Sequence, residues 1–162
     1  ERAERLLALA RPAGVAVVIN DRLDVARAAG ADGVHLGQGD LPARRARALA
    51  GPGLRIGVST HGLAQVDAAL AAGADHVGAG PMFASGTKPR NRIAGPAYIR
   101  ALSGRHPGLA HLAIGGITLE NVSDVVAAGA RGVAVSSAVC GAEDPAAVCR
   151  ALRARVEAGA GA

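Results

Sequence analysis

A chain of 162 residues that is 50% hydrophobic is long enough for one domain with its own core, and its aromatic content of 1% makes that core aliphatic. The formal net charge of +5 favours anionic partners, but the scarcity of aromatic side chains for base stacking argues against nucleic acid. No apolar run has the length of a membrane span and no signal peptide is visible, so we expect no membrane partner. Cys140 and Cys149 belong to no pairing motif, which predicts buried free thiols in a cytoplasmic protein.

Short apolar runs that predict β-strands alternate along the chain with amphipathic helical patterns. The predicted strands lie at residues 15–19, 33–36, 55–58, 76–79, 111–114 and 132–136. A seven-residue sequence motif recurs at residues 28–34, 71–77 and 127–133. Each copy is predicted to end a helix with a glycine suited to the left-handed C′ position and to lead into a strand. Strands that alternate with helices predict βαβ units, a parallel sheet and a single α/β domain over residues 1–162.

Two architectures fit this alternation. A TIM-type (β/α)8 barrel takes about 200 to 250 residues, so we expect the first two β/α units, roughly 50 residues, to be missing from the front of this chain. The alternative is an open, doubly wound sheet of six strands. The residues after the last two predicted strands, Gly115-Gly116 and Ser136-Ser137, favour the barrel, because barrels commonly bind a phosphate group between these two loops.

Acidic and amide side chains follow the first two predicted strands. Asn20 and Asp21 come after the first strand, and Asp40 lies in the loop after the second. Two carboxylates at neighbouring strand ends can share one Mg²⁺, whose remaining ligands come from substrate phosphates and water. Helix capping is the competing explanation, because acidic residues are common just before a helix.

The third predicted strand is followed by Ser59, which is a candidate for either a helix cap or a substrate contact. His35, His61 and His76 are candidates for general bases, although a single histidine on a strand more often has a structural hydrogen-bonding role.

A long loop rich in glycine, proline and basic residues follows the fourth predicted strand. It holds Lys88, the only lysine in a chain with 18 lysine and arginine residues, and the hydroxyl side chains of Ser85 and Thr87. Lysine carries a compact point charge, whereas arginine carries a planar guanidinium group that can bind in a bidentate manner. The two side chains are therefore not equivalent as ligands of a phosphate group. The loop is therefore predicted to be a substrate clamp, with chance survival of the single lysine as the alternative.

Six motifs in this chain, taken in order, resemble the thiamine-phosphate synthase family. They lie at residues 18–22, 33–40, 57–61, 87–88, 113–118 and 132–135 and extend over nearly the whole sequence. The resemblance implies a transferase of bacterial thiamine biosynthesis with a TIM-type barrel. Such an enzyme joins a hydroxymethylpyrimidine diphosphate to a thiazole phosphate, expected in its carboxylated form, and releases pyrophosphate.

The resemblance also implies a role for each matched residue. Asp21 and Asp40 would bind the cofactor Mg²⁺, and Asn20, Ser59 and Lys88 would contact the pyrimidine diphosphate, with Ser59 and Lys88 catalytic. The remaining contacts, to the thiazole phosphate, would come from Ser85, Thr87, Gly115, Gly116, Ser136 and Ser137. The family's Gln-x-Arg-x-Lys segment has no counterpart here and is expected in the missing front part.

Two other functions stay open. A thiazole tautomerase shares the barrel and the thiazole-phosphate pocket, but it does not need the paired carboxylates. A truncated, non-catalytic domain that binds thiazole phosphate is the second alternative. The expected partners are small phosphorylated substrates, and the sequence leaves open whether the chain forms a homo-oligomer.

Overall fold

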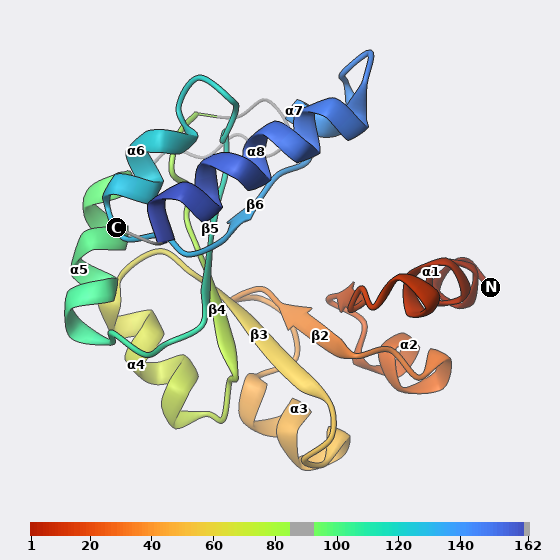
Figure 1. The fold of residues 1–162 in the computed structure, drawn as a ribbon. Coiled ribbons are helices and arrows are strands. Elements are labelled where there is room, and N and C mark those ends of the chain that lie inside the picture. Colours follow the sequence, from red (N-terminus) through yellow and green to blue (C-terminus); the bar gives the residue numbers. More distant parts are fainter. Residues whose placement is uncertain (85–92, 161–162) are drawn as a thin grey trace. The chain divides into compact units, whose positions relative to one another are not determined.

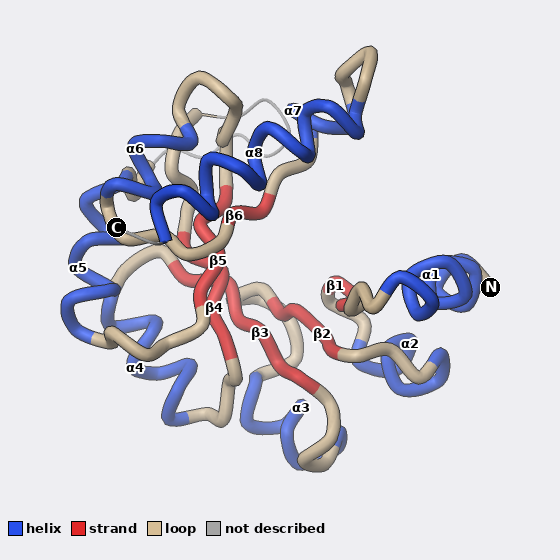
Figure 2. Tube along the Cα trace, in the orientation of Figure 1, coloured by secondary structure: helices blue, strands red, loops and turns tan. Residues whose placement is uncertain are grey.

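The chain folds into helices and strands that alternate along the sequence (Figures 1 and 2). The structure is a computed structural model, and it describes residues 1–84 and 93–160. In chain order its elements are α1 (Arg2–Ala10), η1 (Arg11–Ala13), β1 (Val18–Asn20), α2 (Leu23–Ala29), β2 (Gly33–Leu36), α3 (Ala43–Ala50), β3 (Arg55–Thr60), α4 (Leu63–Ala71), β4 (His76–Ala79), α5 (Pro96–Arg105), β5 (His111–Ile114), α6 (Val122–Ala127), β6 (Val133–Ala134), α7 (Ser137–Cys140) and α8 (Pro145–Ala160). The predicted alternation of strands and helices is confirmed.

The strand order is β1-β2-β3-β4-β5-β6, the same as the order along the chain. The strand pairs β1–β2, β2–β3 and β5–β6 are parallel. A doubly wound sheet requires a point at which the strand order reverses, so that alternative is wrong. The chain divides into two compact units, which we call the first unit (Glu1–Thr60 and Ala64–Val77) and the second unit (His61–Leu63 and Gly78–Ala162).

Aliphatic side chains on one face of β2 and β3 form the core of the first unit. Val34, Leu36, Ile56 and Val58 are buried, and helices α2 and α3 pack on these strands. The helices contribute small side chains such as Ala46, which lets a helix approach the sheet closely. Because side chains alternate along a strand, the residues between these core positions lie on the opposite face of the sheet.

The recurring sequence motif has the predicted left-handed glycines, and two of its copies also link neighbouring strands through an aspartate. Gly30, Gly73 and Gly129 have φ values of 67°, 87° and 104°. In the first two copies an aspartate follows: Asp32 accepts a hydrogen bond from the backbone N–H of Val17, and Asp75 accepts one from Ile56, both at 2.7 Å. Each aspartate therefore ties the start of its own strand to the strand before it.

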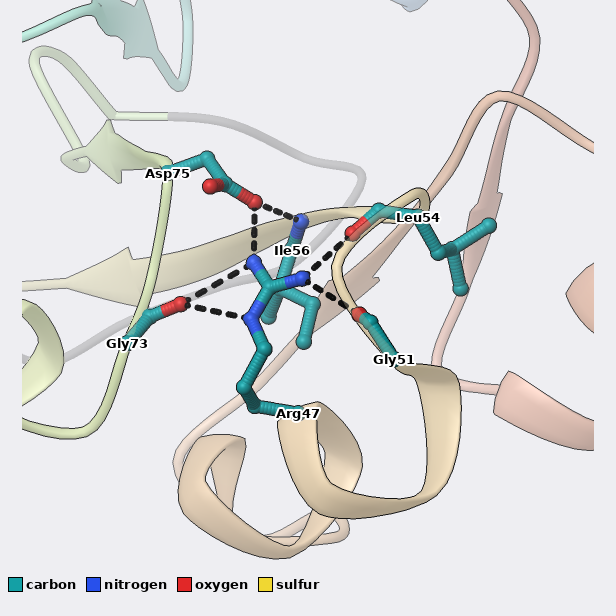
Figure 3. A network of polar contacts seen from close by, with 6 residues as sticks. All are labelled: Arg47, Gly51, Leu54, Ile56, Gly73 and Asp75. Atoms are coloured by element: carbon teal, nitrogen blue, oxygen red, sulfur yellow. Dashed lines mark hydrogen bonds and ion pairs between the residues drawn. The ribbon is translucent and has the colours of Figure 1, made fainter.

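Arg47 on α3 links the segments that precede β3 and β4 in the first unit (Figure 3). Its guanidinium donates to the backbone oxygens of Gly51 (3.0 Å), Leu54 (2.8 Å) and Gly73 (3.1 and 3.3 Å), and it forms an ion pair with Asp75. These contacts engage all five N–H donors of the side chain. Arg47 therefore joins the ends of α3 and α4 to the segment that enters β3.

In the second unit the buried side chains come mainly from α5, α6 and the neighbouring strand β5. Ile99, Leu102, Val122 and Val125 are fully buried, at spacings that follow one face of a helix. Helix α6 packs on α8 and on α5. Among the described residues, no helix combines the length and the apolar character needed to cross a membrane.

Three predictions need correction. Cys140 and Cys149 are exposed, not buried, because one ends a short surface helix and the other lies on the outer side of α8. The first strand begins at Val18 instead of residue 15, and Val15 is exposed in the turn that precedes it. The last strand is limited to two residues, Val133 and Ala134.

Candidate active site

Apart from Lys88, which lies outside the described residues, the predicted pyrimidine and metal residues lie at the carboxyl ends of β1, β2 and β3 in the first unit. Asn20 pairs in register with His35, and His35 pairs with Gly57, two residues before Ser59. The carboxyl ends of parallel neighbouring strands meet at one edge of the sheet, which is where α/β proteins bind ligands. The register therefore brings Asn20, His35 and the end of β3 together.

Asp21 has an unusual backbone conformation at this edge. Its φ is 64°, and it is the only non-glycine residue with a positive φ in the described part of the chain. The turn is fixed by two backbone hydrogen bonds, from Asp21 N–H to the oxygen of His35 (2.8 Å) and from Arg22 N–H to that of Asn20 (2.7 Å). Left-handed non-glycine residues cost free energy and concentrate at functional sites, so the conformation marks Asp21 as a functional candidate.

Asp40 is held by its own loop. Its carboxylate accepts a hydrogen bond from the backbone N–H of Gly37 at 2.7 Å. The N-cap residues of α2 and α3 are Arg22 and Pro42, so helix capping explains neither Asp21 nor Asp40.

The donor chemistry of these two aspartates fits Mg²⁺. Asp21 and Asp40 offer hard carboxylate oxygens from neighbouring strand ends, and Mg²⁺ typically takes one or two carboxylates together with phosphate oxygens and water. Within residues 1–84 and 93–160 there is no group of three or more His, Cys, Asp or Glu that could hold a metal ion. A metal bound between the two aspartates would therefore draw its other ligands largely from substrate and water.

Ser59 forms a hydrogen-bonded cluster with two residues of the second strand and its loop. Its Oγ lies 3.0 Å from Nε2 of His35, and Gln38 Nε2 donates to its backbone oxygen at 2.6 Å. Burial lowers the pKa of His35, and the nearby positive charge of His76 adds to the effect. Burial also lowers the pKa of His76, with Asp75 opposing the shift. Both imidazoles are therefore harder to protonate than an ordinary histidine.

The predicted phosphate residues of the second unit leave neighbouring strands at the same end. Strands β5 and β6 pair Ala113 with Val133 and Ile114 with Ala134, so Gly115-Gly116 and Ser136-Ser137 follow from adjacent strand ends. Ser136 is the N-cap residue of the four-residue helix α7, and both serines are exposed. The structure thus brings these four residues to one edge.

Close packing also explains the glycine pair. Gly115 and Gly116 have φ values of 102° and 64°, and a Cβ on Gly116 would overlap the backbone oxygen of Ala84. Phe83 N–H donates to the oxygen of Gly115 at 2.9 Å, and the Asn121 side chain donates to that of Gly116 at 2.9 Å. The glycines are therefore required for the approach of residues 81–84, whether or not a phosphate binds here.

Three predicted site residues, Ser85, Thr87 and Lys88, lie outside the described residues. Ala94 N–H donates to the backbone oxygen of Pro81 at 2.9 Å, and Gly95 N–H to the same oxygen at 3.3 Å. These two hydrogen bonds hold Ala94 and Gly95 against Pro81 within the second unit.

The sequence left His35 open between a general base and a structural residue, and its contact with Ser59 was not predicted. Both residues face the same side of the sheet, because Ser59 lies two positions beyond Gly57, the register partner of His35. The sequence carried no signal for this contact, because it depends on the register between β2 and β3.

Comparisons with known proteins agree on one family. A family model described as thiamine monophosphate synthase matches residues 1–139. The thiamine-phosphate synthase of Deinococcus radiodurans is 50% identical over 151 residues, which are 93% of this chain and 54% of the relative. That of Methanoculleus marisnigri is 51% identical over 150 residues, which are 90% of this chain and 69% of the relative. This chain therefore spans little more than half of the first relative and about two thirds of the second.

A solved structure gives the same result at the level of the fold. The thiamine phosphate pyrophosphorylase from Pyrococcus furiosus superimposes with a TM-score of 0.89 at 37% identity, covering 98% of this chain and 75% of that one. Family model, relatives and structure together cover nearly all of the described residues, and the chain belongs to the thiamine monophosphate synthase family.

Proposed function

We propose that the protein condenses a hydroxymethylpyrimidine diphosphate with a thiazole phosphate to give thiamine phosphate and pyrophosphate. The observation that carries this proposal is the set of polar residues at the ends of β1, β2 and β3, together with the 50% identity to a thiamine-phosphate synthase. The six strands in sequential order fit a (β/α)8 barrel, in which such residues line the active face.

The first unit would bind the pyrimidine diphosphate. Asn20 at the end of β1 and Ser59 near the end of β3 supply neutral hydrogen-bonding groups. Lys88, which lies outside this unit and outside the described residues, would add a positive charge. Asp21 and Asp40 would hold Mg²⁺, which neutralises charge on the departing diphosphate when it is bound. This division of roles is supported by the donor chemistry of the two aspartates and by the left-handed backbone of Asp21.

The second unit would bind the thiazole phosphate. Gly115, Gly116, Ser136 and Ser137 offer backbone N–H groups and hydroxyls at adjacent strand ends, which is the chemistry that an anionic phosphate requires. Ser85 and Thr87, which lie in the sequence between β4 and α5 and outside the described residues, would complete the thiazole contacts.

The reaction proceeds by loss of the leaving group before attack. The bond between the pyrimidine methylene carbon and the diphosphate oxygen breaks, and its electron pair leaves with the diphosphate. The pyrimidine ring then carries the positive charge until the thiazole nitrogen donates its lone pair to the methylene carbon. The protein's part is to orient both substrates, stabilise the anionic leaving group and exclude water.

Substitution of the proposed residues tests these roles. With both substrates and Mg²⁺ present, Asp21→Ala and Lys88→Ala should each lower turnover by a factor of about 10² or more, as expected when a charge-stabilising group is removed. Asp24→Ala is the matched control, because Asp24 lies only three residues beyond Asp21, is exposed and forms an ion pair with Arg22. Normal turnover in both site variants would overturn the assignment.

We also propose that the protein functions in the cytoplasm, which is a reducing compartment. Its two cysteines are free and exposed, a state that persists where thiols are kept reduced.

A further inference from the structure

The side chain of Asn121 closes the loop that carries the glycine pair of the second unit. Its Oδ1 accepts a hydrogen bond from the backbone N–H of Thr118 at 2.8 Å, and its Nδ2 donates to the backbone oxygen of Gly116 at 2.9 Å. A backbone N–H only donates and a carbonyl oxygen only accepts, so the two contacts fix which end of the amide is oxygen and which is nitrogen. Both polar groups of this side chain therefore bind the loop that follows β5.

Helix capping does not explain these contacts of Asn121. The residue occupies the N-cap position of α6, but it makes no side-chain hydrogen bond to that helix. An asparagine at an N-cap ordinarily accepts a hydrogen bond from the N–H two or three residues further on. Asn121 instead reaches back along the chain, by three residues to Thr118 and by five to Gly116. Its side chain thus supports the loop and not the helix.

The carbonyl oxygens of both glycines are held by donors of the protein. Phe83 N–H donates to the oxygen of Gly115 at 2.9 Å, and Asn121 Nδ2 donates to the oxygen of Gly116 at the same distance. No cis peptide bond lies in this loop, and in a trans peptide the N–H points in the direction opposite to the C=O. The N–H of Gly116 therefore points away from Phe83, and the N–H of Ile117 points away from Asn121.

The resulting arrangement of backbone groups suits an anion. Within the part of the chain that the structure describes, the N–H groups of Gly116 and Ile117 donate to no other residue. Successive backbone N–H groups bind anions, whereas a carbonyl oxygen turned toward a phosphate would repel it. The loop can present its donors because both glycine carbonyls are turned away, and Asn121 holds the second of the two.

We propose that Asn121 is a positioning residue for the thiazole phosphate, which acts by holding the Gly116 carbonyl so that the Ile117 N–H is directed to the phosphate. The proposal rests on the proposed function, since the phosphate is that of the proposed substrate. Asn121 acts through the backbone and makes no contact of its own with the phosphate. Loss of its amide group frees the peptide between Gly116 and Ile117 to rotate, which lowers affinity and leaves the chemical step unchanged.

Calorimetric binding of the thiazole phosphate tests this role. Asn121→Ala should weaken binding about tenfold, the effect of misdirecting one hydrogen bond to a charged group. The KM for the thiazole phosphate should rise by a similar factor, while kcat changes by less than about twofold, as expected when only binding is lost. Binding of inorganic pyrophosphate with Mg²⁺, which is assigned to the first unit, should be unchanged. Ser123→Ala, at an exposed position of the same helix, is the matched control and should alter none of these values.

Amide hydrogen exchange followed by NMR reports on the loop without any substrate. The Thr118 N–H should exchange faster in Asn121→Ala, because its acceptor is removed. Asn121→Asp is a second variant in case the alanine variant does not fold, since it retains an acceptor for Thr118 but sets a carboxylate oxygen against the oxygen of Gly116. It should keep Thr118 protected and still bind thiazole phosphate more weakly than the unsubstituted protein. This difference should persist in about 1 M salt, which screens the added charge.

Unchanged affinity for the thiazole phosphate in either folded variant of Asn121 would overturn the proposal. An equal loss of pyrophosphate binding would also overturn it, because the effect would then extend beyond the loop. Failure of the proposed function has a different signature, namely that Thr118 exchanges faster in Asn121→Ala but the unsubstituted protein binds no thiazole phosphate. That result would overturn the phosphate role of Asn121 together with the proposed site.

Discussion

Replacement of Arg47 by alanine removes a side chain whose five donors are all engaged within the first unit (Figure 3). Each of the three backbone carbonyls it contacts contributes about 1 kcal/mol net. The ion pair with Asp75 adds about 0.5 kcal/mol, because that carboxylate is 47% exposed and solvent screens the attraction. We therefore expect Arg47→Ala to lower the free energy of unfolding by roughly 3 to 4 kcal/mol.

Urea unfolding followed by circular dichroism measures this change, and the melting temperature should fall by on the order of 10 °C. Arg47→Lys should lose about 2 kcal/mol, because a lysine retains the charge but cannot contact several carbonyls at once. Arg45→Ala, an exposed arginine on the same helix, is the control and should change stability by less than about 0.5 kcal/mol. A loss below about 1 kcal/mol for Arg47→Ala would refute the view that this network supports the fold.

Three further predictions concern the site and its surroundings. Gly116→Ala should destabilise the protein and weaken binding of the thiazole phosphate, measured by calorimetry, because the new methyl group overlaps the backbone oxygen of Ala84; unchanged stability would contradict the close approach. The pKa values of His35 and His76 are lower in the folded protein than the ordinary value of about 6.5, so the unfolded chain binds more protons in acid. Stability should therefore be constant above about pH 7 and decline as the pH falls below about 6.5, a slope that His76→Phe reduces in urea titrations at several pH values. Both cysteines should react with a thiol reagent in the folded protein, and protection of either would contradict their exposure.

The order of strands and helices was predictable because it is encoded locally. Three copies of one sequence motif place a glycine between a helix and a strand, and all three glycines have the predicted left-handed conformation. The ends of elements were less predictable, as the late start of β1 illustrates, because an apolar residue such as Val15 can lie in an exposed turn. The cysteines were assigned wrongly since composition gives the average burial of a residue type and does not identify the helix face on which it lies.

The candidate site was predictable where residues follow strand ends and less so where strands pair. Asp21, Asp40 and Ser59 come directly from such positions, but the left-handed turn at Asp21 depends on a hydrogen bond to the neighbouring strand. The contact between His35 and Ser59 depends on the register of two strands, which a single sequence does not specify.

The most direct test of the proposed condensation is a balance of products. The protein is incubated with Mg²⁺, the pyrimidine diphosphate and the thiazole phosphate, and thiamine phosphate and pyrophosphate are quantified over time. The account predicts that both products form in equal amounts and that neither forms when one substrate is omitted. Recovery of both substrates unchanged from folded protein, or isomerised thiazole phosphate without any thiamine phosphate, would contradict it.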